Sequence, residues 1–194
     1  MTDLITDLRL GMPGRHNVEN AIAASTMALR EGVSPAALRQ GLDSFRGVSR
    51  RFETRIKGSS VVLIDDYAHH PKELDACIES VREMYPGKRI TGIFQPHLYS
   101  RTRDLAKDFG RSLSALDELL LLDIYPAREE PIPGITSQWL LEQIPMAAKQ
   151  CVTRERLLEE LRRSHGEVVV TLGAGDIDRL VPVVESLLNE RDRS

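Results

Sequence analysis

The feature that most restricts the fold is a regular alternation of short apolar runs with helical segments after residue 48. Five segments are candidate strands, of which the first is expected to be buried. They lie at 61–65, 89–95, 118–124, 148–152 and 167–172. Helices are expected at 72–85, 103–116, 137–143, 154–164 and 176–189. Strands that alternate with helices form right-handed βαβ units, so we predict an α/β fold whose mostly parallel sheet has helices on both faces. Arg50–Lys57 is a candidate strand for one edge.

The first 48 residues follow a different pattern. Leu4–Leu10 alternates apolar and polar residues, which predicts one strand. Two helices are expected next, one over 16–31 and one that starts at Ser34 and Pro35, a favourable N-cap and first-turn pair. A lone strand cannot form a sheet. We therefore expect this segment to be the end of a domain whose body is missing, which divides the chain into domains 1–48 and 49–194.

Composition and charge argue against several classes of protein. The formal net charge is −3 and aromatic residues make up 5%, which does not favour binding to nucleic acid or to anionic lipid. No apolar run approaches the ~18 residues of a membrane span, and the N-terminus lacks a signal-peptide pattern. Cys77 and Cys151 have neither a metal-binding nor a redox spacing. We expect a cytoplasmic protein without nucleic-acid partner or membrane insertion.

Ionisable side chains gather directly after the first of the predicted strands, in Asp65-Asp66-Tyr67-Ala68-His69-His70-Pro71. Ligands of open α/β sheets bind at the carboxyl ends of strands. This favours a ligand site in which Asp66 bonds ribose hydroxyls while His69 and His70 lie near a second substrate. Two alternatives stay open. The segment could be a hydrogen-bond network that only closes the turn, or a metal-dependent hydrolase site on Asp66, His69 and His70, although no further cluster has a zinc-binding spacing.

A second polar segment, Pro96 to Arg101, follows the next strand. If the strands 61–65 and 89–95 are neighbours, His97 and Arg101 face the same crevice as His69. A guanidinium binds a carboxylate through two parallel hydrogen bonds, so Arg101 is the candidate to hold an anionic substrate. The alternative is a helix capped by Ser100 with an exposed arginine.

Two polar segments elsewhere carry weaker signals. Asn17 and Asn20 are three residues apart on a predicted helix, so their amides could contact an adenine edge. A polar first helical turn, with His16 as a local hydrogen-bonding residue, explains them as well. Arg51 beside Phe52 could reach a phosphate or ribose, or lie on the surface.

Glycine motifs for phosphate binding are weak or absent. Gly173-Ala174-Gly175-Asp176 is similar to the start of a dinucleotide fingerprint, but a tight turn with Asp176 as helix N-cap explains it adequately. The sequence contains no Gly-x-x-x-x-Gly-Lys-Ser/Thr, so we expect no P-loop.

Taken together, these segments resemble the Mur ligase family. The matching text is Gly14–Ala21, Arg50–Glu53, Asp65–Pro71, Phe94–Thr102, Asp123–Glu129 and Gly173–Ile177. The resemblance implies a Rossmann-like C-terminal domain, preceded by a strand-helix-helix remnant of the central ATPase domain. The P-loop lysine, the magnesium-binding glutamate and the UDP site of the family would then lie outside this chain, which alone is expected to be inactive.

The resemblance implies ATP-dependent amide formation, with Mg²⁺ neutralising phosphoryl charge. Within the family, the chain specifically resembles members that join L-alanine to the lactyl carboxylate of UDP-N-acetylmuramate through an acyl phosphate, in peptidoglycan precursor synthesis. The residues implied to contact ATP are Asn17, Asn20, Arg51 and Asp66. Those implied to surround L-alanine are Tyr67, His69, His97 and Arg101, with His16 and His70 as weaker candidates. Neither a metal ligand nor a catalytic residue is assigned, and Leu98 stands where some relatives have an arginine.

Two further alternatives remain open at the level of the sequence. One is the muropeptide ligase of the same family, which joins a preformed peptide to the same sugar nucleotide. The other is a stand-alone nucleotide-binding module that keeps the fold without turnover.

Overall fold

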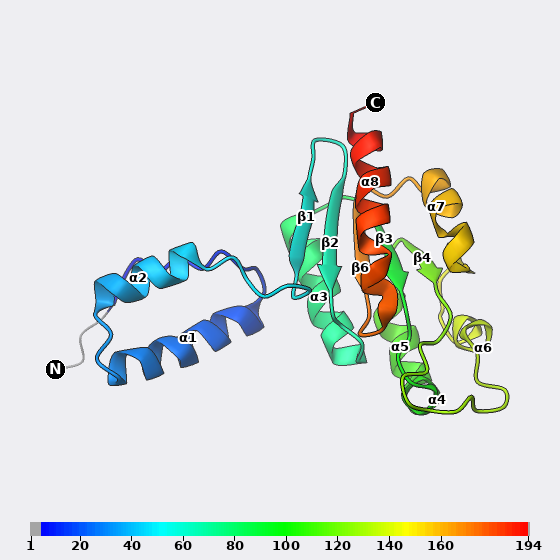
Figure 1. Cartoon of the computed structure of the whole chain (residues 1–194), viewed down its shortest axis with the longest axis horizontal. Helices are drawn as coiled ribbons and strands as arrows, with labels where there is room; N and C mark the ends of the chain where they lie inside the picture. Colours follow the sequence, from blue (N-terminus) through cyan, green and yellow to red (C-terminus); the bar gives the residue numbers. More distant parts are fainter. Residues whose placement is uncertain (1–4, 194) are drawn as a thin grey trace. The chain divides into compact units, whose positions relative to one another are not determined.

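The computed structural model describes residues 5–193, except for the side chain of His16. The chain forms two compact units, one up to Ser49 and one from Arg50 onward (Figure 1).

The first unit is built on a helical hairpin of α1 (Arg15–Arg30) and α2 (Pro35–Ser44). Both predicted helices are confirmed. The Ser34 hydroxyl accepts a hydrogen bond from the Ala37 amide at 3.3 Å, which makes Ser34 the expected N-cap of α2. The strand predicted over Leu4–Leu10 is wrong for its described part, because residues 5–10 have no regular secondary structure. An extended segment becomes a strand only when it pairs with a neighbour, and none of the described segments pairs with this one.

The second unit contains a six-stranded sheet in the part of the chain that the structure describes. Its strands are β1 (Glu53–Lys57), β2 (Val62–Asp66), β3 (Ile90–Phe94), β4 (Glu118–Leu121), β5 (Lys149–Cys151) and β6 (Val168–Leu172). The spatial order is β1-β2-β6-β3-β4-β5, with β1 antiparallel and all other pairs parallel. The mostly parallel sheet and the candidate edge strand within Arg50–Lys57 are thus confirmed.

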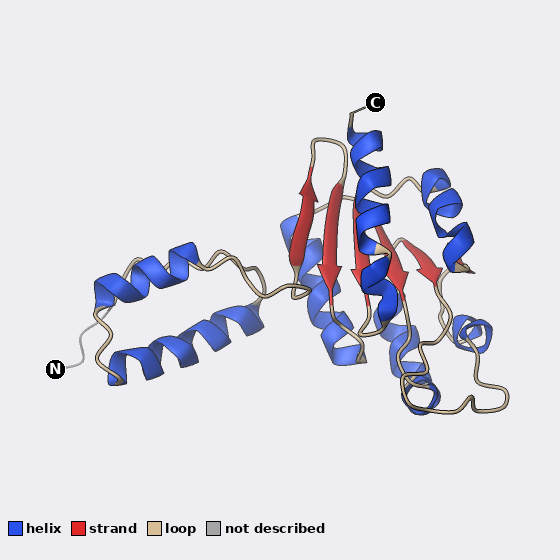
Figure 2. Cartoon of the chain, viewed as in Figure 1, coloured by secondary structure: helices blue, strands red, loops and turns tan. Residues whose placement is uncertain are grey.

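Helices cover both faces of the sheet (Figure 2). They are α3 (Pro71–Met84), α4 (Tyr99–Asp104), α5 (Ala106–Leu113), α6 (Ser137–Glu142), α7 (Arg154–Arg163) and α8 (Val181–Asp192). A 3-10 turn, η1 (Asp176–Arg179), precedes α8. The single helix predicted over 103–116 is wrong, because α4 starts at Tyr99 and the backbone leaves the helical region at Leu105, where φ is −112°.

The core consists of one apolar cluster on each face of the sheet. Side chains of α3, α5 and α6 pack on one face, and those of α7 and α8 pack on the other. Within β6, Val168 and Val170 belong to the first cluster and Val169 to the second. Burial on both faces explains why the central strands β2, β3, β4 and β6 are rich in apolar residues.

The strands that carry the two polar segments are not neighbours. β6 lies between β2 and β3, with Val170 opposite Ile64 on one side and Gly92 on the other. The adjacency expected from sequence order is therefore wrong. β6 is buried along its whole length, and the centre of the sheet is where such a strand removes most apolar surface from water.

Candidate functional site

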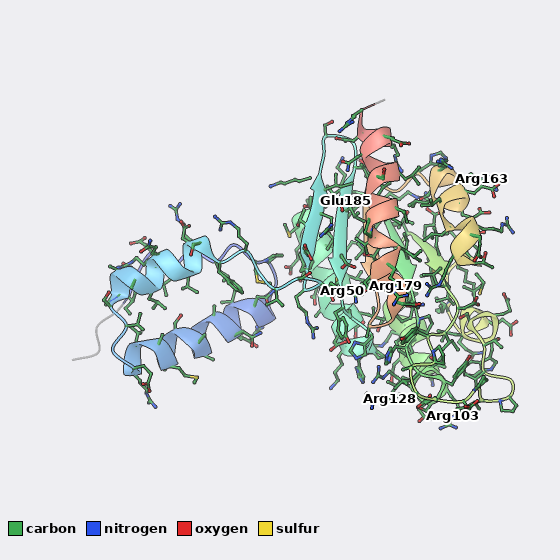
Figure 3. All side chains as sticks on the ribbon, in the orientation of Figure 1. Arg50, Arg103, Arg128, Arg163, Arg179 and Glu185 are labelled. Carbon is green, nitrogen blue, oxygen red and sulfur yellow. The ribbon has the colours of Figure 1, made fainter. Side chains whose placement is uncertain are left out.

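Loops at the carboxyl ends of β2, β3, β4 and β6 form the candidate site. Although β6 separates the two strands, the ring centroids of His69 and His97 are 5.8 Å apart. The structure therefore brings the two polar segments of the sequence together. Figure 3 shows Arg50 and Arg179 at this end of the sheet, and Arg103 and Arg128 beyond it at α4 and the neighbouring loop.

The loop after β2 fixes His69 through the start of α3. Nδ1 of His69 lies 2.9 Å from the carbonyl oxygen of Tyr67 and 3.2 Å from Oε2 of Glu73. The same Glu73 oxygen accepts hydrogen bonds from the backbone amides of His69 and His70. With Nδ1 donating to these oxygens, Nε2 carries the free lone pair of the neutral ring. His69 therefore has a fixed ring with one nitrogen available to a ligand.

His70 has a different local role. It is the N-cap residue of α3, and its Nδ1 accepts a hydrogen bond from the Lys72 amide at 3.3 Å. Together with Glu73 it forms a capping box, and Pro71 occupies the first helical turn. A substrate contact of His70 stays a prediction.

Arg101 forms no ion pair with a carboxylate among the described residues, and the Glu129 carboxylate interacts with its charge only at longer range. Its Nη1 lies 3.4 Å from Nδ1 of His97, and no carboxylate oxygen is within 4.0 Å of it in the described part of the chain. Arg50, by contrast, pairs with Asp65 at 3.3 Å. A guanidinium that forms no ion pair and lies beside an imidazole can bind the carboxylate of a small ligand.

His97 is held between α4 and the loop that follows β4. Its ring stacks on Tyr125 with centroids 5.6 Å apart, and the two residues form a parallel β-bridge. Burial lowers the pKa of His97, and the positive charge of Arg101 and the ring of His69 lower it further, while Glu129 acts in the opposite direction. His97 is therefore neutral near pH 7.

Titration of His97 by NMR is expected to show a midpoint below its ordinary pKa of 6.5. The unfolded chain takes up this proton at about pH 6.5 and the folded chain at lower pH, so this group lowers stability as pH falls below about 6.5. Arg101→Ala should move the midpoint upward, because it removes a nearby positive charge. Arg111→Ala, on α5, is the control that should leave the midpoint unchanged. If Arg101→Ala also left the midpoint at its wild-type value, this geometry would be contradicted.

Two arginines lie over the ring of Tyr67. The Cζ atoms of Arg50 and Arg51 are each 5.2 Å from the ring centroid, which is within cation–π range. Nη2 of Arg50 also donates to the carbonyl of Gly173 at 2.6 Å, so Arg50 ties the start of this unit to the loop after β6. Arg51 makes no such bond in the described structure, and its contact with ATP stays a prediction.

Asp66 fixes the backbone around the site. Its two carboxylate oxygens accept hydrogen bonds from the amides of Phe52 and Ala68, each at 2.7 Å. Phe52 has φ +49°, so the carboxylate holds a turn that its own backbone disfavours. Burial raises the pKa of Asp66. The ribose contact proposed for Asp66 stays a prediction.

Asn17, Asn20 and His16 belong to the first unit. Nδ2 of Asn17 donates to the carbonyl of Pro13 at 2.6 Å, which stabilises the first turn of α1. Asn20 is exposed, and the side chain of His16 lies outside the described part of the chain. Adenine contacts of these residues stay predictions.

Two capping roles that the sequence offered as alternative explanations are wrong. Ser100 does not cap α4, because its hydroxyl and its amide both donate to Glu129. Asp176 does not cap a helix either, since its carboxylate pairs with Arg154 and accepts from Nε2 of Gln95 at 3.0 Å. Aspartate and serine are both favourable N-cap residues, but here their side chains form hydrogen bonds or ion pairs with residues far away in the sequence.

Tyr125 and Glu129 are site residues that sequence reasoning missed. They lie on the loop after β4, which meets the site only in the folded chain. The loop after β6 passes so close that a Cβ on Gly175 would lie 2.7 Å from Cβ of Tyr125 and also contact Gln95. The glycines of Gly173-Ala174-Gly175 therefore reflect close packing of this loop. The sequence signal that could have indicated Tyr125 and Glu129 is the polar loop that follows a third predicted strand.

The hydrolase alternative gains no support from the geometry. No group of three His, Cys, Asp or Glu side chains in the described residues is placed to hold a metal ion.

The same part of the chain contains no helix that is long and apolar enough to cross a bilayer.

Comparison with known proteins decides the family. The sequence profile described as "Mur ligase, glutamate ligase domain" matches residues 50–175. The chain belongs to the Mur ligase family. The resemblance seen in the sequence motifs is thus confirmed.

Several Mur ligases are similar to this chain over almost all of its length. It is 48% identical to the UDP-N-acetylmuramate–L-alanine ligase of Flavobacterium johnsoniae, over 97% of this chain and 42% of that protein. It is 57% identical to the ligase of the same name from Porphyromonas gingivalis, over 93% and 40%. The chain therefore spans about two fifths of the length of these relatives.

Solved Mur ligase structures agree with the fold. The UDP-N-acetylmuramate-alanine ligase of Thermotoga maritima superposes with a TM-score of 0.74 at 28% identity, over 93% of this chain and 40% of that one. The murein peptide ligase of Psychrobacter arcticus gives a TM-score of 0.64 at 22% identity, which shows the fold alone.

Proposed function

We propose that this chain is the amino-acid-binding, C-terminal part of an ATP-dependent ligase of the cytoplasm. The ligase would join L-alanine to the lactyl carboxylate of UDP-N-acetylmuramate in peptidoglycan precursor synthesis. The observation that carries the proposal is the guanidinium of Arg101, which forms no ion pair with a carboxylate among the described residues and lies beside His97 at the carboxyl ends of the strands. Relatives 48% and 57% identical to this chain carry the name of that ligase.

The proposed reaction has two steps. ATP transfers its terminal phosphoryl group to the lactyl carboxylate, which yields an acyl phosphate and ADP. The amine of L-alanine, after losing a proton, attacks the acyl carbon. The C–N bond forms, the C–O bond to phosphate breaks, and inorganic phosphate leaves.

This chain would bind and orient the amino acid. Arg101 would hold the carboxylate of L-alanine, and Tyr67, His69 and His97 would enclose the rest of the molecule. Because His97 is neutral near pH 7, it does not repel the substrate's ammonium group. Enclosure by these rings also excludes water, which would otherwise hydrolyse an acyl phosphate.

The nucleotide would be shared with the rest of the enzyme. We assign the segment up to Ser49 to the end of the central ATPase domain, with Asn17 and Asn20 at the adenine and Arg51 and Asp66 at the ribose and phosphates. Mg²⁺ prefers carboxylates together with substrate phosphates. The described residues offer no cluster of such groups, so Mg²⁺ would be held by ATP and by residues outside this chain.

The decisive assay measures ADP release by the complete enzyme with UDP-N-acetylmuramate and a second substrate. L-alanine should support turnover, and the cell-wall tripeptide should not. Preference for the tripeptide would instead identify a muropeptide ligase. ATP binding without turnover on either substrate would favour a nucleotide-binding module.

The 194-residue chain alone is expected neither to hydrolyse ATP nor to ligate L-alanine, because its sequence contains no P-loop to position the phosphates. Circular dichroism should first establish that the purified chain is folded. Ligation above background by that folded preparation would contradict the prediction.

A further inference from the structure

The helix that carries Arg101 has no cap of its own. Leu98, at the N-cap position of α4, has φ +74° and no side-chain oxygen, so it makes no capping hydrogen bond. The first amides of a helix need acceptors from elsewhere. Here the acceptor comes from a residue far along the chain.

Glu129 supplies that acceptor. One of its carboxylate oxygens accepts from the Ser100 amide at 2.9 Å and the other accepts from the Ser100 hydroxyl. The hydrogen bonds from Ser100 keep the pKa of Glu129 below its ordinary value, with smaller contributions from the nearby Tyr99 amide and the positive charge of Arg101. A negative charge at a helix N-terminus is also favoured by the helix dipole.

The loop that carries Glu129 is anchored to the same segment a second time. The Leu98 amide donates to the carbonyl of Tyr125 at 2.9 Å, and the Tyr125 amide donates to the carbonyl of Pro96 at 2.8 Å. His97 lies between these two bonds and stacks on Tyr125. The backbone of His97 and the first turn of α4 are thus both held by the loop after β4.

Because Ser100 engages the Glu129 carboxylate, Glu129 interacts with the charge of Arg101 without forming an ion pair with it. Both carboxylate oxygens are occupied at Ser100, and no ion pair joins Glu129 to Arg101 within 4.0 Å in the described structure. A carboxylate released from Ser100 would be one residue from Arg101 and would compete with a substrate carboxylate for the guanidinium.

We propose that Glu129 is a positioning residue for the amino-acid site: by capping α4 from the loop after β4, it directs Arg101 and His97 toward the substrate. This inference rests on the proposed function. Glu129 touches neither substrate nor reacting atoms, so its effect on ligation is indirect. The proposal predicts that its loss weakens binding of the amino acid without weakening binding of the nucleotides.

The test compares Glu129→Ala, Glu129→Gln and the control Glu130→Ala, an exposed neighbour on the same loop, in the complete enzyme. Glu129→Ala should raise the KM for L-alanine on the order of 10- to 100-fold, since misplacing a binding group by about 1 Å has effects of that size. The KM values for ATP and UDP-N-acetylmuramate should change less than about twofold. Glu129→Gln should recover part of the loss, because its amide oxygen can still accept from Ser100.

Hydrogen exchange provides a readout that does not depend on ligation. The Ser100 amide should exchange roughly tenfold faster in Glu129→Ala and at the wild-type rate in Glu130→Ala, because exchange follows local opening. Wild-type ligation of L-alanine together with an unchanged KM in Glu129→Ala overturns this inference alone. A wild-type enzyme that does not use L-alanine overturns the proposed function, and the inference with it.

Discussion

Replacing Arg101 by alanine in the complete enzyme is expected to raise the KM for L-alanine about 10- to 150-fold and to leave the KM for ATP nearly unchanged. A hydrogen bond to a charged group contributes about 1.5–3 kcal/mol, which corresponds to that range. The effect should fall on the amino acid, because the Arg101 guanidinium lies against His97 and pairs with no carboxylate in the described residues. Initial rates at varied L-alanine and varied ATP measure both constants.

Arg103→Ala is the matched control on the same helix. Arg103 is half exposed, and its Nε pairs with the adjacent Asp104 at 2.7 Å, whereas Arg101 forms no ion pair in the described residues. This variant should keep the wild-type KM for L-alanine within about twofold. Equal increases in the KM values of both substrates in Arg101→Ala would reject the carboxylate-binding role.

Replacing Asp66 by alanine is expected to lower the free energy of unfolding by about 2–4 kcal/mol. The change leaves the amides of Phe52 and Ala68 buried without their acceptor, and each unsatisfied buried group costs about 1–3 kcal/mol. It also releases the turn at Phe52, whose φ of +49° is unfavourable for a residue with a Cβ. Urea unfolding followed by the fluorescence of Trp139, the single tryptophan, measures the loss.

Asp123→Ala is the control for this experiment. Asp123 also follows a parallel strand but is exposed, so its removal should change stability by less than about 0.5 kcal/mol. If Asp66→Ala kept the wild-type stability while raising the KM for ATP, its main role would be the ribose contact and not the turn.

Local sequence pattern was sufficient for most of the secondary structure. The strands β2 and β6 each begin with a run of three apolar residues because both of their faces are buried, and this signal needs no knowledge of the partner strand. Helix starts such as Ser34-Pro35 and His70-Pro71 were also readable, since capping acts within one turn. The strand predicted over Leu4–Leu10 was wrong for the opposite reason. Strand pairing depends on a neighbouring segment, which the local pattern does not reveal.

The candidate site was only partly readable from the chain. His69, His97 and Arg101 were recognised because each follows a strand, and the carboxyl ends of parallel strands meet at one edge of the sheet. Their grouping holds even though the expected adjacency of β2 and β3 does not, because the loops cross the end of β6.

Residues that act across long sequence separations could be found only in the folded chain. Glu129 is 29 positions from Ser100, and Asp176 is 81 positions from Gln95. In the sequence, Ser100 and Asp176 look like ordinary helix caps, since local propensity favours that role. The chain's own residue pattern thus determined its strands, its main helices and the polar character of its loops. Strand order and the partners of those loops were decided by tertiary packing, because burying β6 at the centre of the sheet set which loops meet.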